Sequence, residues 1–163
     1  MTPNKITVHC SASKPSIAKN ETAASIRAIH KAKGWRDIGY HYVIRRDGAT
    51  EKGRADSVIG AHVKGHNNNN LGICLAGGVD ENGKPERNYT DAQYHALYAL
   101  IVDLCKKHNI QHQEVYGHRD WFGDSNGDGV IDSRDWLKEC PCFDVRQWLS
   151  KELKLNLNNK EGL

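Results

Sequence analysis

The stretch from Gly117 to Phe143 carries the residues of this chain that are best suited to chemistry. It opens with His118, closes with Lys138 and Cys140, and holds an acidic loop between them. Imidazole nitrogen and thiolate sulfur are favoured zinc ligands, and a catalytic zinc site needs two or three of them and an open position for water. These residue types indicate that His118 and Cys140 bind a catalytic zinc ion, with His9 as a third ligand.

Spacing alone does not select this set of zinc ligands. The chain contains nine histidines and five cysteines, so other triplets can be drawn from it. It has no CxxC pair and no HExxH motif, whose spacings are typical of zinc sites. Three cysteines, Cys10, Cys74 and Cys105, lie in apolar segments and are interpreted as small buried side chains. An odd cysteine count in a chain of this length does not favour a disulfide framework.

The acidic loop has the residue spacing of a calcium-binding EF-hand loop. With Asp124 at the first position, Gly129 stands where the loop turns sharply, and Val130 offers its carbonyl oxygen. The other oxygen ligands of the pattern are supplied by Asn126, Asp128, Asp132 and Asp135. Aspartate replaces the usual final glutamate, as in the loops of dockerin modules, which this stretch resembles. The alternative is a solvated turn rich in Asp, Asn and Gly. A paired EF-hand domain is not expected, because there is only one such loop.

Strands alternate with helices along the chain, which favours an α/β layered fold. Side-chain periodicity and turn signals predict strands over residues 6–10, 42–46, 50–52, 71–75 and 114–116. Helices are predicted from about residue 22 to 33, 90 to 109 and 143 to 153. A length of 163 residues suits one domain. We expect this domain to span residues 1–155, with the acidic insertion at 124–135 and a polar tail at 156–163.

Charge and hydropathy argue against several classes of function. The formal net charge of +3 is compatible with an anionic wall polymer but is too small and too scattered to indicate nucleic-acid binding. No apolar run is long enough for a membrane span. The N-terminus lacks a basic region followed by an apolar one, so no secretory signal and no membrane anchor are expected.

Five sequence motifs together resemble one known family. ITVHCSAS, GWRDIGYHYVIRRDG, GAHVKGHNNNNLGICLAGG, YGHRD and KECPCFD follow in the order and approximate spacing of the type 2 N-acetylmuramoyl-L-alanine amidases. This family shares its fold with the peptidoglycan-recognition proteins and with small phage lysozymes of the amidase kind. The resemblance runs from Ile6 to about Leu149. It implies a single α/β domain in which helices flank both sides of a central mixed sheet, with zinc in a surface cleft.

The resemblance also implies roles for individual residues. The zinc ligands would be His9, His118 and Cys140. Tyr40 matches a tyrosine that points at the zinc-bound water in catalytic members, and Lys138 matches a lysine that faces the scissile carbonyl. His62 lies in a loop that lines the substrate groove. Zinc lowers the pKa of bound water to about 7 and polarises the carbonyl, while a lysine ammonium and a tyrosine hydroxyl can stabilise the resulting oxyanion.

These features predict a zinc-dependent amidase that cleaves the bond between N-acetylmuramic acid and L-alanine in bacterial peptidoglycan. Without a secretory signal, a monomeric phage endolysin fits best, made in the host cytoplasm and acting on the wall after release. A bacterial amidase exported by another route and a secreted effector are further options. The acidic insertion departs from the family pattern, and we expect bound calcium to order the segment that carries Lys138 and Cys140.

Two other classes of function compete with the enzyme. One is a non-catalytic peptidoglycan-binding module, although family members that only bind peptidoglycan generally lack the cysteine ligand. The other is a calcium-binding interaction protein, which requires the joint presence of His9, His118 and Cys140 to be a coincidence.

Overall fold

The computed structural model describes residues 1–123, 125–130, 132 and 139–161, and only the backbone from residue 157 onward. Three residues singled out in the sequence, Asp124, Asp135 and Lys138, lie outside the described residues.

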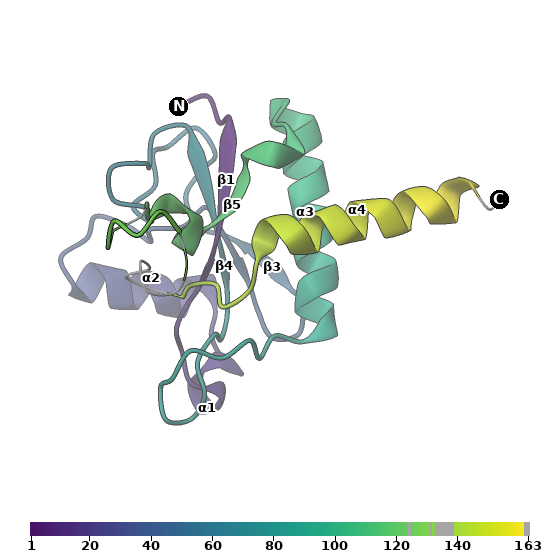
Figure 1. The fold of residues 1–163 in the computed structure, drawn as a ribbon. Helices are drawn as coiled ribbons and strands as arrows, with labels where there is room; N and C mark the ends of the chain where they lie inside the picture. The colour runs from purple at the N-terminus through teal and green to yellow at the C-terminus, as the bar shows by residue number, and fades with distance from the viewer. Residues whose placement is uncertain (124, 131, 133–138, 162–163) are drawn as a thin grey trace.

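A five-stranded mixed sheet forms the centre of the protein, in the order β3-β2-β4-β1-β5 (Figure 1). The long strands β1 (Lys5–Cys10) and β4 (Asn70–Leu75) pair in parallel. On either side of them, β5 (Val115–Gly117) pairs in parallel with β1, and β2 (Tyr42–Ile44) with β4. The edge strand β3 (Thr50–Lys52) is antiparallel to β2. The predicted mixed sheet and the predicted hairpin are therefore confirmed.

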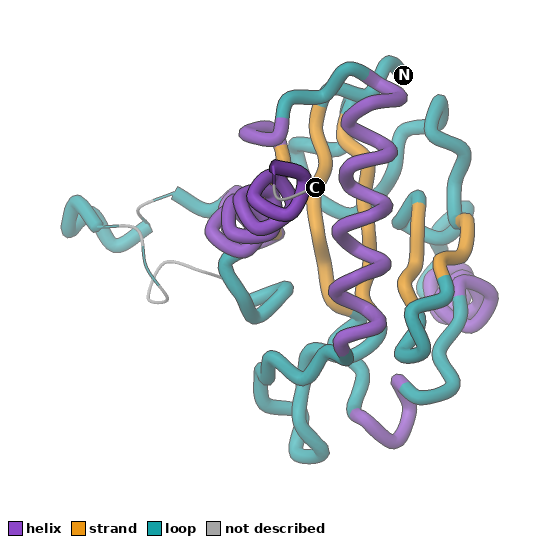
Figure 2. Tube along the Cα trace, turned by 90° about the vertical axis from the view of Figure 1, so that its right-hand side faces the viewer, coloured by secondary structure: helices purple, strands orange, loops and turns teal. Residues whose placement is uncertain are grey.

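Helices cover both faces of the sheet (Figure 2). On one face, α3 (Asp91–His108) and α4 (Val145–Glu161) pack on the larger core cluster. On the other face, α2 (Ala23–Ala32) packs on a smaller cluster that includes Cys74. The remaining helical elements are short: α1 (Pro15–Ala18), η1 (His112–Glu114) and η2 (His118–Trp121). Because helices cover both faces, the central strands are buried on both sides.

Alternation along β1 decides which side chains reach which layer. Ile6 and Val8 belong to the larger core, on the side of α3 and α4. Thr7 and His9 therefore point to the opposite side, where α2 packs. His9 pairs in register with Cys74, which belongs to the smaller cluster. This opposite side carries the polar residues of the strand, as the periodicity predicts.

Capping residues account for the observed helix ends. Thr22 and Thr90 each form a capping box at the start of α2 and α3, close to the predicted starts of both helices. The last helix differs from its prediction, which ended it at Leu153. It begins at Val145, where Asp144 Oδ1 accepts the Gln147 N–H at 2.8 Å, and it continues to Glu161. The polar residues after Leu153 did not end α4, because no proline or glycine interrupts the helix before Gly162.

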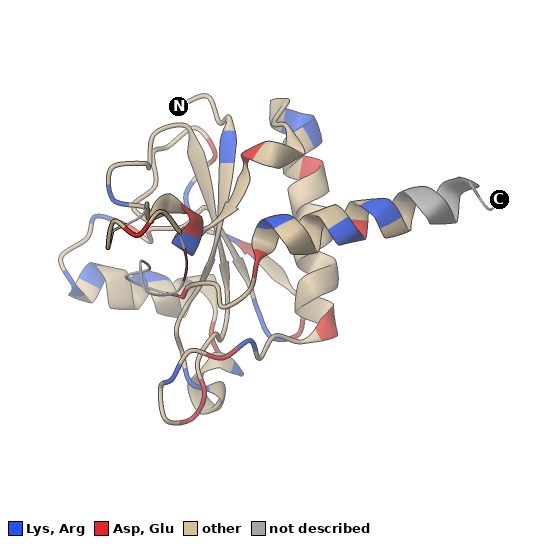
Figure 3. Cartoon of the chain, in the orientation of Figure 1, with Lys and Arg blue, Asp and Glu red and all other residues tan. Residues whose placement is uncertain are grey.

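Basic and acidic residues are interspersed over the helices, strands and loops (Figure 3). None of the helices in the described part of the chain combines the length and the hydropathy required to cross a membrane.

Asp56 joins three separate parts of the fold. Its carboxylate lies 2.6–3.0 Å from donors on β2, β3 and the end of α3, which are Tyr42 Oη, Lys52 Nζ, Lys107 Nζ and His108 Nε2. Burial by itself raises the pKa of Asp56, but hydrogen bonds from the two lysines, Tyr42 and His108 outweigh it and lower the pKa. The ionised carboxylate therefore holds the hairpin against α3.

We expect the Asp56→Asn variant to lose about 1–2 kcal/mol of unfolding free energy at pH 7. The loss is modest because both lysines are exposed, so that water screens their ion pairs with Asp56. The folded-state pKa of Asp56 lies below the unfolded value of about 3.9. Its stabilising contribution is therefore present above about pH 3.9 and is lost as the pH falls toward the folded-state pKa. Urea unfolding at pH 7 and pH 3.5 should show a difference between variant and wild type that shrinks at the lower pH. Asp103→Asn, an exposed site on α3, is the control, and an equal loss there would contradict this role for Asp56.

Candidate metal centre

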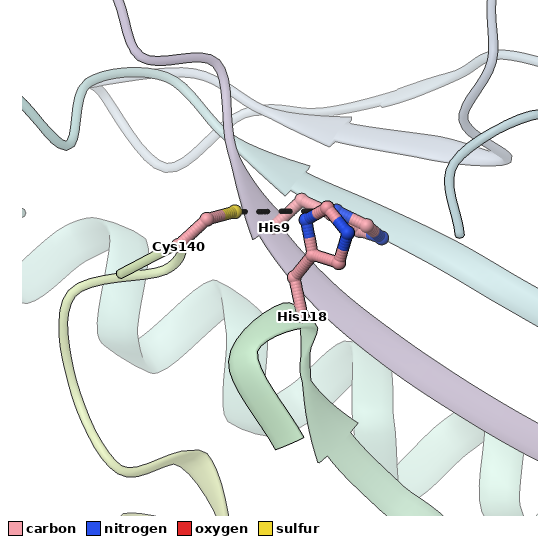
Figure 4. Close-up of side chains that lie close together, drawn as sticks. All are labelled: His9, His118 and Cys140. Carbon is pink, nitrogen blue, oxygen red and sulfur yellow. Dashed lines mark hydrogen bonds between the residues drawn. The ribbon is translucent and has the colours of Figure 1, made fainter. Parts of the chain in front are cut away.

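His9, His118 and Cys140 converge beside the carboxyl ends of β1 and β5 (Figure 4). Their ligand atoms all lie within 4.8 Å of one another, and Cys140 Sγ lies 4.0 Å from His9 Nδ1. Within the described ranges, no other group of three or more His, Cys, Asp or Glu side chains is arranged in this way. The three residues that the sequence suggested as zinc ligands are thus brought together by the fold.

Strand pairing places the two histidines next to each other. Val8 of β1 pairs with Gly117 of β5, so His9 and His118 are the next residues on two parallel neighbouring strands. Their ring centroids are 4.5 Å apart. His9 is only 1% exposed, because this end of the sheet is covered by the rings of Tyr40 and His62. His9 is therefore buried although it is a polar residue of β1.

A tight turn aims His118 at the centre. His118 begins η2 directly after β5, and the Gly117 N–H donates to Asp120 Oδ2 at 2.7 Å. Gly117 also lets another segment come close, since a Cβ at this position would lie 3.1 Å from Pro141 Cδ. The absence of a side chain at Gly117 therefore leaves room for the segment that carries Cys140.

Three hydrogen bonds hold the segment that carries Cys140 against the sheet. The Arg119 N–H donates to the Cys140 carbonyl oxygen at 2.9 Å, and the Tyr89 hydroxyl donates to the Pro141 carbonyl at 2.8 Å. The Cys10 N–H donates to Cys140 Sγ at 3.1 Å. Such a donor stabilises negative charge on sulfur. The Cys10 side chain is buried, as expected. In addition, the backbone N–H of Cys10 orients the Cys140 sulfur.

The donor set and its spacing fit a zinc ion. Two imidazoles and one thiol are ligand types of catalytic zinc sites that keep an open position. With bond lengths of about 2.0–2.3 Å, ligands around a tetrahedral zinc lie roughly 3.3–3.7 Å apart. The observed 4.0 Å between Cys140 Sγ and His9 Nδ1 is within a few tenths of an ångström of this range. The widest separation in the group, at most 4.8 Å, is about 1 Å longer than this range.

Tyr40 and His62 both lie in contact with His9. The ring of Tyr40 is 5.2 Å from that of His9, and burial, followed by the nearby Cys74 and Cys140 thiols, raises the pKa of Tyr40 well above its ordinary value. Tyr40 is therefore a neutral phenol that can donate a hydrogen bond. Burial lowers the pKa of His62 to about 3, so its imidazole is neutral.

A groove of about 610 Å³ opens next to His118. Its walls include the predicted groove residue His62 and a set of aromatic side chains, among them Trp35, Trp121, Phe122 and His66. His66 stacks on Trp121 with ring centroids 4.6 Å apart, and the Trp121 indole N–H donates to Thr7 Oγ1 at 3.0 Å. A larger hollow of about 730 Å³, beside Asp56, contains none of the three ligands. Of these two hollows, only the groove is lined by a candidate ligand, His118.

Sequence reasoning missed these aromatic walls. Trp121 and Phe122 follow the YGHRD motif directly, and Trp35 precedes the GYH motif by a few residues. Large aromatic residues next to ligand motifs were the available signal. Periodicity did not reveal them because they lie outside strands and long helices.

Comparison with known proteins shows the family of this chain. Residues 1–136 match the family model described as N-acetylmuramoyl-L-alanine amidase. The chain belongs to this family. The endolysin of Enterobacteria phage T3 is 40% identical over 150 residues, which are 92% of this chain and 87% of that protein. As a member of the family, the chain is a hydrolase that cleaves the amide bond between N-acetylmuramic acid and L-alanine in peptidoglycan.

Solved structures show the same fold. The N-acetylmuramoyl-L-alanine amidase LysC from Clostridium intestinale URNW superposes with a TM-score of 0.69 at 30% identity, covering 97% of this chain and 87% of that chain. The bumblebee protein PGRP-SA superposes with a TM-score of 0.67 at 22% identity, covering 92% of this chain and 82% of that chain. The latter similarity concerns the fold alone.

The acidic loop of this amidase is described only in part. The Asn126 side-chain oxygen accepts the Asp128 N–H, and Asp128 Oδ1 accepts the Val130 N–H, both at 2.9 Å. Gly129 has a φ of 82°, in the left-handed region that favours glycine. Asp124 and Asp135, the first and last predicted ligands, lie outside the described residues. Calcium binding therefore stays a prediction.

We expect the zinc affinity of the Cys140→Ser variant to fall by more than about 100-fold. Loss of a hydrogen bond to a metal ligand lowers the affinity by up to about 100-fold, and loss of the ligand itself should cost more. A serine hydroxyl is a much poorer zinc ligand than a thiolate. Competition with a chromophoric chelator measures the affinity. Cys105→Ser is the matched control, because Cys105 is buried on α3 in the opposite layer. Equal zinc affinity in both variants would exclude Cys140 as a ligand.

Proposed function

We propose that His9, His118 and Cys140 hold the catalytic zinc ion of this amidase. The observation that carries this proposal is their convergence within 4.8 Å at the ends of two parallel strands. The groove beside His118 supports it, because a polymeric substrate can reach the centre from there. When bound in such a site, zinc supplies a Lewis acid for the amide carbonyl and lowers the pKa of water to about 7.

In this proposal Tyr40 and Lys138 stabilise the charge that develops on the carbonyl oxygen. The neutral Tyr40 phenol, next to His9, can donate a hydrogen bond to that oxygen. Lys138 matches the family lysine that faces the scissile carbonyl, and its role rests on that match and on its position two residues before Cys140. A hydrogen-bond donor and a cation directed at the developing oxyanion would favour the transition state over the flat ground-state amide.

The groove walls suit peptidoglycan. Aromatic faces such as Trp35 and Trp121 can pack against sugar rings or the apolar faces of a peptide, while Lys64 adds a positive charge on the same wall. The relatives named endolysin support a role in bacterial wall lysis by a phage, with a monomer acting on the wall after its release. We assign residues 1–155 to the catalytic domain and retain residues 156–163 as a polar end that is helical as far as Glu161.

A non-catalytic peptidoglycan-binding module is the alternative. The presence of Cys140 among the three converging groups favours the enzyme, since the family resemblance associates loss of the cysteine with binding alone.

Digestion of purified peptidoglycan, followed by mass spectrometry, tests the proposed function. We expect free stem peptides that begin with L-alanine, their loss when zinc is stripped and their return when zinc is restored. Wall binding without released peptide would favour the binding module instead. Released sugars or cut cross-links would contradict cleavage of the N-acetylmuramic acid to L-alanine bond.

We expect Tyr40→Phe and Lys138→Ala each to slow stem-peptide release by about 100- to 1000-fold, the usual effect of removing one donor to an oxyanion. Zinc content should stay at the wild-type level in both variants, because neither residue is a proposed ligand. Tyr98→Phe on α3 and Lys151→Ala on α4 are the matched controls and should retain the wild-type rate. A Tyr40→Phe enzyme as fast as its control would remove Tyr40 from the mechanism.

The acidic loop is proposed to bind calcium and to order the segment that leads to Lys138 and Cys140. Alternating oxygen donors and the left-handed Gly129 support this assignment. In the absence of a cation, the clustered carboxylates would repel one another and loosen the segment. The ion has no chemical role in this proposal.

Thermal melting with calcium or with a calcium chelator tests the loop. Wild type should melt at a higher temperature with calcium, and Asp128→Ala should lose this increment. Asp80→Ala is the control, because Asp80 accepts similar backbone hydrogen bonds in a different turn, from the Asn82 and Lys84 N–H groups. It should retain the calcium increment. A wild type that melts identically in both conditions rules out the calcium site.

A further inference from the structure

His62 lies directly behind His9, on the side away from Cys140. The two rings meet edge to face, with centroids 5.0 Å apart and planes at 89°. His9 Nε2 lies 3.0 Å from His62 Nδ1, and His62 Nε2 lies 3.0 Å from the Asn70 carbonyl oxygen. Both ring nitrogens of His62 are therefore engaged, one by the candidate ligand and the other by the backbone of β4.

These contacts decide which nitrogens carry protons. A carbonyl oxygen can only accept, so His62 Nε2 must carry the hydrogen that it donates to Asn70. When the His62 imidazole is neutral, its one N–H is the one on Nε2, so Nδ1 accepts and His9 Nε2 is the donor to it. With its hydrogen on Nε2, an uncharged His9 would have its lone pair on Nδ1, the nitrogen that lies 4.0 Å from Cys140 Sγ.

We propose that His62 is a positioning residue that directs the Nδ1 lone pair of His9 at the metal. The chain of groups runs from the Asn70 carbonyl through the two ring nitrogens of His62 to His9 Nε2. This inference rests on the proposed zinc site. It gives His62 a role distinct from contact with substrate, although His62 also lines the groove.

The protein is shaped to hold the His62 ring in this orientation. A Cβ at Gly72 would lie 2.7 Å from His62 Cγ, and a Cβ at Gly60 would lie 2.6 Å from His62 Cδ2. Both positions are glycine, so the ring can pack directly on backbone. Asn67 Oδ1 accepts the His62 N–H at 2.7 Å and the Val63 N–H at 2.9 Å, which fixes the backbone of the loop.

Neighbouring polar groups support the same arrangement. His41 accepts the Gly72 N–H at 2.9 Å on Nδ1 and lies 2.9 Å from the Val58 carbonyl through Nε2. Its ring meets that of His62 at 86°. Asn70, which holds His62, is itself fixed, because its side-chain oxygen accepts the Thr7 hydroxyl at 3.0 Å. The Asn70 residue, whose carbonyl accepts from His62, is thus fixed by contacts of its own, as the His62 ring is.

Loss of the acceptor at His62 would have two consequences. His9 Nε2–H would become a buried donor without its partner, which is costly. The other tautomer of His9 would then compete, with its hydrogen on Nδ1 in place of the lone pair. Removal of an outer hydrogen bond to a metal ligand typically lowers metal affinity by about 10- to 100-fold.

A pair of variants separates the acceptor from the bulk of the side chain. In His62→Asn the side-chain oxygen branches from Cγ, as Nδ1 does, and can accept from His9. His62→Leu has nearly the same size and shape but no acceptor. We expect zinc affinity, measured by chelator competition without any substrate, to fall about 10- to 100-fold in the leucine variant. The asparagine variant should retain most of the wild-type affinity. The visible spectrum of bound cobalt should change with leucine and be restored with asparagine.

Leucine and asparagine variants that bind zinc equally well, or equally poorly, would overturn the proposal, because the acceptor would then make no difference. A wild type that binds no zinc would overturn the zinc site itself, and this inference with it. Melting of the zinc-free variants detects a general loss of folding.

Nuclear magnetic resonance of the wild type tests the same point without any variant. Long-range proton–nitrogen correlations should show His9 and His62 both as Nε2–H tautomers. A His9 ring that carries its hydrogen on Nδ1 would overturn the proposal.

Discussion

The parallel pairing of β1 with β5 is the constraint on which the rest of the site depends. Because Val8 and Gly117 are paired, the next residues, His9 and His118, emerge side by side at the carboxyl ends of the two strands. The third group, Cys140, has no strand of its own and reaches the centre through hydrogen bonds to Cys10 and Arg119, which belong to the same two segments. The pairing of β1 with β5 thus brings together three candidate ligands that are far apart in the sequence.

The side of the sheet that faces α2 differs from the side that faces α3 and α4. The larger core is apolar, whereas near the site the α2 side carries buried polar groups that include Thr7, His9, His41 and Asn70. Burying such groups is costly unless they are hydrogen-bonded. Here they bond one another and the backbone, and that network orients the candidate ligands. Stability and the placement of the candidate ligands therefore depend on the same contacts.

The similarity to phage endolysins and to amidase structures covers the whole framework of sheet and helices. The family match ends at residue 136, just after the acidic insertion and before Cys140. The insertion lies between the second and third candidate ligands.

Local sequence determined the pieces of this protein. Residue types offered His9, His118 and Cys140 as candidate ligands, although their spacing did not select them. Capping threonines at helix starts and the Asp-Gly pair of the hairpin are further signals that act over a few residues. The family resemblance supplied the remaining roles.

Tertiary structure decided the strand order, the burial of His9 and the partners of His62. It also decided that the Cys10 backbone supports Cys140 and that aromatic residues wall the groove. These features depend on contacts between segments far apart in the chain. Side-chain periodicity assigns a residue to a face of a strand, but it cannot tell which other segment covers that face.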